Sequence, residues 1–155
     1  MKSNIINFPN LREANLVLGN TVRIPVFRTP ISAGDPTDVP DQEQFDEYMD
    51  IPEDFLSDPD YNYVHKVKGD SMYPLLKDGD RVLVDCSDSA KYDGVLSKVI
   101  VAYTEEGFNV KRLEKIKGNY CLVPENPKYP IRKISEYTNF DIKGVVLGII
   151  QFKPI

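Results

Sequence analysis

The chain has 155 residues, a formal net charge of −5 and 41% hydrophobic residues. This hydrophobic content supports a packed core and excludes a wholly disordered chain, while the acidic excess argues against a broad cationic surface for nucleic acid. No stretch approaches the ~18 unbroken apolar residues of a transmembrane helix, and residues 1–19 lack the pattern of a secretory signal. We therefore expect a cytoplasmic protein without membrane association.

The residue types that usually carry metal or triad chemistry are scarce. Cys86 and Cys121 form neither a metal-binding spacing nor a disulfide framework, so small buried hydrophobic roles are expected for them. The single histidine, His65, lies within an alternating strand pattern and is expected to be a partly exposed strand residue. We accordingly expect no metal ion and no other cofactor.

Residues 1–40 are predicted to form an extended, flexible arm, because seven of the 12 prolines lie before residue 60 and interrupt regular elements. Short helical stretches are predicted at 10–18 and 42–49. The segment 35–60 contains 11 acidic residues and no lysine or arginine. It is interpreted as a solvated surface segment, with the alternative that it steers the arm across a mildly basic face.

Residues 41–155 are predicted to form a compact, mostly β domain. Runs rich in β-branched and aromatic residues recur about every ten residues between turn signals, which is typical of a small rolled sheet or barrel. Two of these runs form a hairpin with Gly107 in its loop. The predicted strands cover residues 61–67, 80–85, 98–103, 108–113, 119–123 and 140–152.

The segment Gly69-Asp-Ser-Met-Tyr-Pro74 directly follows the first of these strands. Ser71 is predicted to lie where the chain leaves the sheet, before a helical turn over 72–76. The backbone N–H groups of Ser71 and Met72 would then point outward and could stabilise an oxyanion. A serine hydroxyl needs a base to become a nucleophile, and without a suitable histidine the remaining option is a lysine whose pKa is lowered by burial.

Lys111 is the candidate base. Alternation along its strand places Phe108 and Val110 on one face and Asn109, Lys111 and Leu113 on the other. A lysine in a strand usually extends to water, and an isolated Gly-Asp-Ser usually marks a turn, so neither pattern identifies a site by itself.

In their order along the chain, several motifs together resemble the LexA/UmuD family of self-cleaving Ser–Lys peptidases. They are the segment around Ser71, then Asp78-Gly-Asp-Arg-Val-Leu-Val-Asp85, then Val110-Lys-Arg-Leu113. The family also requires a scissile dipeptide upstream, commonly Ala-Gly or Cys-Gly, and Ala33-Gly34 stands at the corresponding place. The resemblance covers roughly residues 22–152.

This resemblance implies that Ser71 is the nucleophile, Lys111 the general base and the Ala33–Gly34 bond the cleaved peptide. It implies a mostly β domain of the LexA C-terminal type, with the arm laid into its active-site cleft. It further implies a homodimer and intramolecular cleavage, stimulated by RecA filaments on single-stranded DNA in the SOS response to DNA damage.

Within the family, the segments 24–27, 33–36 and 45–51 resemble the UmuD branch most. The 33 residues before Gly34 are too few for the helix-turn-helix domain of LexA and phage repressors, so no direct sequence-specific DNA binding is expected. The UmuD branch implies a processed form that serves as an accessory subunit of a Y-family translesion DNA polymerase. The alternatives are the dimerisation and self-cleavage module of a phage-type repressor without its DNA-binding domain, and a non-cleaving binding module.

Overall fold

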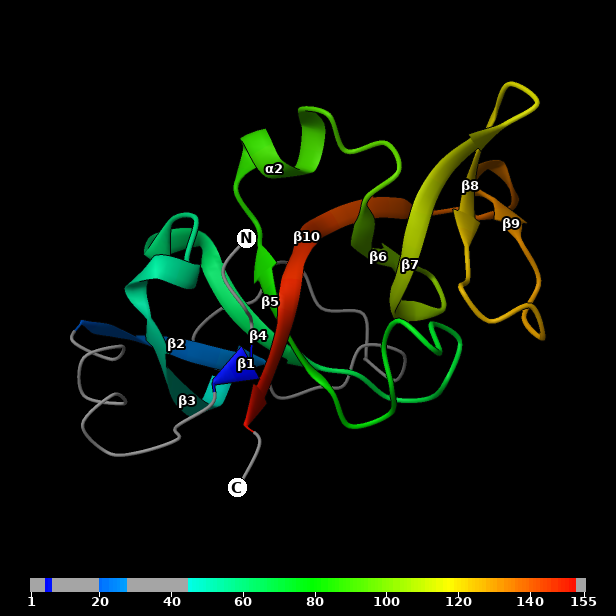
Figure 1. Ribbon diagram of the computed structural model, residues 1–155. Helices are drawn as coiled ribbons and strands as arrows, with labels where there is room; N and C mark the ends of the chain where they lie inside the picture. The colour runs from blue at the N-terminus through cyan, green and yellow to red at the C-terminus, as the bar shows by residue number, and fades with distance from the viewer. Residues whose placement is uncertain (1–4, 7–19, 28–44, 153–155) are drawn as a thin grey trace.

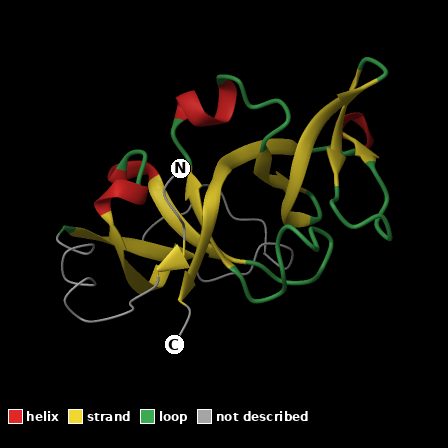
Figure 2. Ribbon diagram, viewed as in Figure 1, coloured by secondary structure: helices red, strands yellow, loops and turns green. Residues whose placement is uncertain are grey.

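The computed structural model describes residues 5–6, 20–27 and 45–152, and strands dominate these ranges (Figures 1 and 2). The helical elements of the described residues are short, and none is long and apolar enough to cross a membrane. They are η2 (Glu53–Phe55), η3 (Pro59–Tyr61), α2 (Asp88–Tyr92) and η4 (Ile134–Glu136). The strands are β1 (Ile5–Ile6), β2 (Thr21–Phe27), β3 (Phe45–Pro52), β4 (Asn62–Lys66), β5 (Arg81–Asp85), β6 (Val99–Thr104), β7 (Gly107–Ile116), β8 (Asn119–Val123), β9 (Arg132–Lys133) and β10 (Phe140–Phe152).

The strands form one open sheet in the order β3-β2-β4-β5-β10-β6-β7-β8-β9, with β1 added beside β10. Strand β10 joins two halves of the sheet, because residues 145–150 pair with β5 and residues 140–145 pair with β6. The register on the β6 side shifts between Ile142 and Gly144. A Cβ at Gly144 would collide with the side chain of Val84, so glycine allows the close approach of β10 to β5 at this point.

The mostly β fold predicted from the sequence is confirmed. Six strands (β4, β5, β6, β7, β8 and β10) each overlap a run predicted from aromatic and β-branched residues, and β6 and β7 form the predicted hairpin. Helix α2 was not predicted. It begins after Ser87, whose side chain accepts a hydrogen bond from the backbone N–H of Ala90.

The helical stretch predicted over 42–49 is wrong for its described residues, because β3 begins at Phe45. Strand β3 pairs with β2 in an antiparallel register from Thr21↔Pro52 to Phe27↔Phe45. Its side chains alternate, with Tyr48 exposed and Met49 packed against the core. Strand β2 also places residues 21–27 of the predicted arm inside the sheet, and the predicted helix at 10–18 lies outside the described residues.

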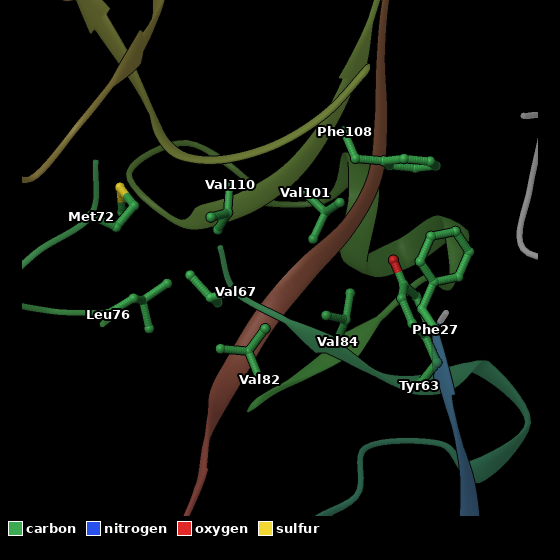
Figure 3. Packing of buried hydrophobic residues seen from close by; sticks show 10 residues of the cluster. All are labelled: Phe27, Tyr63, Val67, Met72, Leu76, Val82, Val84, Val101, Phe108 and Val110. Carbon is green, nitrogen blue, oxygen red and sulfur yellow. The ribbon is translucent and has the colours of Figure 1, made fainter. Parts of the chain in front are cut away.

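One hydrophobic cluster connects distant parts of the chain (Figure 3). At one end of the cluster, Met72 and Leu76 from the segment after Ser71 lie beside Val67 and Val110. Because Val110 belongs to β7, the core itself holds the segment that carries Ser71 against the strand that carries Lys111. Burial of such side chains stabilises the arrangement by about 1.5–3 kcal/mol for each large residue.

His65 is fully buried, so the predicted partly exposed position is wrong. Its ring packs edge-on against Phe27, with 4.4 Å between ring centroids, and also contacts Tyr63 and Phe108. Within the described part of the chain, neither ring nitrogen of His65 has a hydrogen-bond partner, and the hydroxyl of Tyr63 has none either. Burial lowers the pKa of His65 to about 3, so this histidine is neutral at physiological pH.

Candidate active site

Ser71 lies in a tight turn that follows β4. Gly69 adopts φ 86°, a conformation that favours glycine, and its backbone N–H donates to the carboxylate of Asp78 at 2.7 Å. Met72 is 1% exposed and anchors the turn in the core. The N–H of Leu76 donates to the carbonyl of Met72 at 2.8 Å, which closes one helical turn where the sequence predicted it.

The backbone N–H groups of Ser71 and Met72 are not used by the turn itself. Of the described residues, none accepts a hydrogen bond from the N–H of Ser71 or of Met72, whereas the N–H of Tyr73 donates to the carbonyl of Asp70. Free donors at the start of a turn are the groups from which an oxyanion hole is built. The role of the N–H groups of Ser71 and Met72 in an oxyanion hole stays a prediction.

Lys111 lies on β7, with the alternation predicted from the sequence. Phe108 and Val110 are 2% and 3% exposed on the core side, while Asn109 and Lys111 share the other side and are half-buried. The antiparallel pairing of β6 and β7 sets Lys111 opposite Ile100. The hairpin thus fixes the backbone from which the lysine side chain extends.

The structure brings Ser71 and Lys111 together, although they are 40 residues apart in the chain. The Nζ of Lys111 donates to the Oγ of Ser71 at 2.8 Å, to the Oδ1 of Asn109 at 2.5 Å and to the carbonyl of Val110 at 3.1 Å. All three acceptors are uncharged groups. Among the described residues, no carboxylate forms an ion pair with this ammonium.

Burial lowers the pKa of Lys111 from 10.5 to about 8, because the charged amine is removed from water without a carboxylate beside it. With this pKa, about one tenth of the molecules carry a neutral amine at pH 7, against fewer than ~1 in 1,000 for an ordinary lysine. In the neutral form the same hydrogen bond reverses, and the Ser71 hydroxyl donates its proton to Nζ. The pair can therefore transfer a proton from the serine to the lysine.

A pocket of about 250 Å³ opens beside this pair. Ser71, Asn109 and Lys111 contribute to its polar lining, and Leu122 and Tyr137 add apolar surface. An extended peptide placed here would lie next to the serine hydroxyl. In the described ranges, no group of three His, Cys, Asp or Glu side chains is placed to hold a metal ion.

Asn126 was missed by the sequence analysis and lies directly against the serine turn. Its backbone N–H donates to the carbonyl of Ser71 at 3.0 Å, and its side-chain Nδ2 donates to the carbonyl of Asp70 at 3.0 Å. Tyr129 reinforces the contact, because its hydroxyl donates to the carboxylate of Asp70. Asn126 also accepts a hydrogen bond from the N–H of Lys128 through Oδ1.

The proposed scissile residues, Ala33 and Gly34, lie outside the described residues. The two residues that bound this segment in the structure are Phe27 and Phe45, whose rings pack against each other with 5.6 Å between centroids. The two flanking residues thus lie side by side in the sheet.

Comparison with known protein families identifies the family of the chain. The model of the Peptidase S24-like family matches residues 25–147, most of the chain. The chain belongs to this family. It thus shares a family with peptidases, and the pocket with the Ser71–Lys111 pair falls inside the matched range.

Several relatives carry the name LexA repressor. The protein of Paracidovorax citrulli is 36% identical over 63% of this chain and 41% of its own length. Those of Delftia acidovorans and Teredinibacter turnerae are 31% and 30% identical over 78% of this chain, which corresponds to 51% and 59% of the relatives. The chain thus spans about half the length of the curated relatives it matches.

Proposed function

We propose that this protein is a serine peptidase that cleaves its own Ala33–Gly34 bond, with Ser71 as nucleophile and Lys111 as general base. The observation that carries the proposal is the 2.8 Å contact between the lysine Nζ and the serine Oγ at the wall of an open pocket. A lysine serves as a base only when it is neutral, and the lowered pKa of Lys111 supports this role.

In the proposed reaction, neutral Lys111 takes the proton of Ser71 while Oγ attacks the carbonyl carbon of Ala33. The backbone N–H groups of Ser71 and Met72 donate to the oxyanion that forms. The intermediate collapses when Lys111 returns the proton to the amine of Gly34, which leaves. A water molecule then gives a proton to Lys111 and attacks the ester carbonyl. As the ester bond breaks, Lys111 returns that proton to the Oγ of Ser71, and the carboxylic acid of Ala33 loses its proton to solvent.

The length of the segment before the proposed scissile bond supports cleavage within one chain. Ala33 is six residues from Phe27, and an extended chain of this length spans up to about 20 Å. The Phe27 ring lies 5.2 Å from that of Phe108, and three further residues along β7, about 10 Å, lead to Lys111. A tether of this length is compatible with cleavage within one chain, which would gain the rate advantage of proximity.

For partners, we propose a homodimer and activation by a RecA filament on single-stranded DNA. Support comes from the sequence resemblance and from relatives named LexA repressor. The cleavage reaction itself requires only the residues of this chain, so the filament would act by favouring the conformation in which the arm occupies the pocket.

The role after cleavage has two candidates. The segments around the scissile bond resemble the UmuD branch, which supports a processed accessory subunit of a translesion polymerase. The relatives named LexA repressor support the alternative, in which cleavage inactivates a repressor-type protein. Binding of the processed chain to a Y-family polymerase, measured by co-purification, would favour the first candidate.

The proposed cleavage is tested by incubating the purified protein with and without RecA and single-stranded DNA, followed by mass spectrometry. We expect a new N-terminus at Gly34 and a partner fragment that ends at Ala33. Ser71→Ala should abolish both products while its thermal melting curve stays close to that of the wild type. Cleavage at another bond, or in the Ser71→Ala variant, would contradict the proposal.

A further inference from the structure

Strand β2 lies inside the sheet, between β3 and β4, yet it precedes the proposed cut in the chain (Figure 1). Resting on the proposed cleavage at Ala33–Gly34, we infer that the two products remain bound to each other. Residues 20–27 of the N-terminal product keep their place as a strand in the sheet of the C-terminal product. The interaction surface is thus the slot between β3 and β4, and its occupant is the chain's own N-terminal fragment.

Backbone pairing provides the first part of this attachment. Strand β2 pairs with β3 along seven residues, from Thr21↔Pro52 to Phe27↔Phe45, and with β4 at Val26↔Val64. The N–H of Glu53 also donates to the carbonyl of Asn20 at 3.0 Å. Every partner in these contacts lies after the cut, so hydrolysis at residue 33 breaks none of them.

Side-chain burial provides the second part. Ile24, Val26 and Phe27 are each 1% exposed. Ile24 and Val26 belong to a cluster that also contains Ile51, Val64 and Leu83, and the Phe27 ring contacts residues of β4 and β7. An apolar strand held this way resembles an added strand in a sheet, where the main chain gives affinity and buried side chains give specificity.

Departure of β2 would also remove the support of β3. In the described sheet β3 is an edge strand whose single strand neighbour is β2. Its other links are side-chain contacts, which include the ion pairs of Glu47 with Lys66 of β4 at 2.9 Å and Arg81 of β5 at 3.2 Å and the ring contact of Phe45 with Tyr63. Loss of β2 would therefore expose Ile51, Val64 and Leu83 together, which makes dissociation unfavourable.

The experiment is to let the full-length protein cleave itself and then to separate the products without denaturant. We expect a denaturing gel to show two fragments, and native mass spectrometry and size-exclusion chromatography at low micromolar concentration to show one species that contains both. Elution of residues 1–33 apart from residues 34–155 would overturn the inference.

A second experiment separates failure of this inference from failure of the proposed cleavage. In Ser71→Ala with a recognition sequence for a site-specific protease inserted between residues 33 and 34, added protease makes the cut. Retention of the fragment in this protein supports the inference whether or not the wild type cleaves itself, and loss of the fragment overturns it.

A matched pair of substitutions in β2 tests the slot itself. Ile24→Ala removes buried contacts and should speed exchange of the cut fragment by about tenfold or more, whereas Thr21→Ala, at an exposed position of the same strand, should change it by less than about twofold. Val26→Ala replaces Ile24→Ala in this experiment if Ile24→Ala unfolds the uncleaved protein at the temperature of the measurement. Equal exchange rates in the buried and exposed variants would overturn the assignment of the slot.

Discussion

The half-buried amine of Lys111 and the fully buried ring of His65 differ in what surrounds them. Lys111 stands at the wall of a pocket and contacts Ser71, Asn109 and the carbonyl of Val110. His65 stands in an aromatic cluster, where neither ring nitrogen has a partner among the described residues. Burial lowers the pKa of both, to about 8 and to about 3 respectively.

The comparison of Lys111 with His65 indicates that loss of hydration alone does not make a catalytic base. Lys111 has a hydroxyl to deprotonate, an opening for a substrate and a pKa within reach of physiological pH. His65 has none of these, and its chemistry at pH 7 is that of a neutral aromatic ring. Substitutions of Lys111 and His65 should therefore have different effects on cleavage and on stability.

The largest effect should come from exchanging the two bases for apolar side chains. Lys111→Met should lower the rate of self-cleavage by about 10²–10⁴-fold, because the serine loses its proton acceptor. His65→Leu should leave the rate within about twofold of the wild type, because His65 takes no part in the proton transfer. Both rates are measured by densitometry of time courses. An equally impaired His65→Leu that still melts cooperatively would contradict the contrast.

The dependence of the rate on pH should follow Lys111. Its neutral form is the active one, so the self-cleavage rate should rise about tenfold per pH unit below the pKa of about 8 and level off above it. The comparison of pH 6 with pH 8 in matched buffers shows the rise most clearly. A rate that does not vary over this range would remove the lysine from its proposed role.

Asn126→Asp should lower the rate about tenfold or more. The aspartate keeps an oxygen for the N–H of Lys128 but loses the Nδ2 donor that holds the carbonyl of Asp70, so the serine turn is less well positioned. If the loss comes from positioning, the pH profile keeps the midpoint set by Lys111.

Two further outcomes test this interpretation of Asn126. A self-cleavage rate equal to that of the wild type in Asn126→Asp would show that Asn126 stabilises only the turn at residues 126–128. A profile displaced to higher pH would assign the loss to the new negative charge. Tyr129→Phe, which removes the other hydrogen bond to Asp70, should give a smaller loss with an unchanged midpoint.

The free energy of unfolding at acidic pH should depend on His65. Its pKa is about 3 in the folded protein and 6.5 in the unfolded chain, so the unfolded chain binds the extra proton between these values. The wild type should therefore lose about 1.4 kcal/mol of unfolding free energy per pH unit as pH falls below 6.5, and His65→Leu should lack this part of the slope. Urea titrations at pH 5 and pH 7 measure the difference.

The smallest effect should appear on the alkaline side. Between about 8 and 10.5 the unfolded chain holds the lysine proton more tightly than the folded one, so stability linked to Lys111 rises with pH. Lys111→Met should raise the unfolding free energy at pH 7 by about 1–2 kcal/mol, since lost hydrogen bonds offset part of the gain. The advantage should shrink as pH approaches 10.5, and an advantage that grows with pH would contradict the linkage.

Local patterns predicted much of the β6–β7 hairpin. Alternation in a strand has a period of two, so the sequence alone placed Asn109 beside Lys111 and opposite Val110. The contact between Ser71 and Lys111 could be predicted only from the family resemblance. Contacts between residues 40 positions apart depend on how the strands are ordered in the sheet.

Other features depended on neighbours that no local pattern reveals. Pro25 and the many acidic residues after it hid β2 and β3, although Met49 and Ile51 alternate with exposed residues. His65 is buried because Phe27 and Phe108 cover it from remote strands. Asn126 stands in a proline-rich loop, and its contacts appear only when that loop meets the serine turn.

Strand β10 gives the molecule a mechanical property. Ser71 follows β4 and precedes β5, whereas Lys111 belongs to β7, so the two residues come from the two halves of the described sheet that β10 joins. The contact between them therefore depends on how β10 holds β5 and β6, and the close approach of β10 to β5 at Gly144 is part of that junction. A larger residue at position 144 would disturb this junction and with it the alignment of the two side chains.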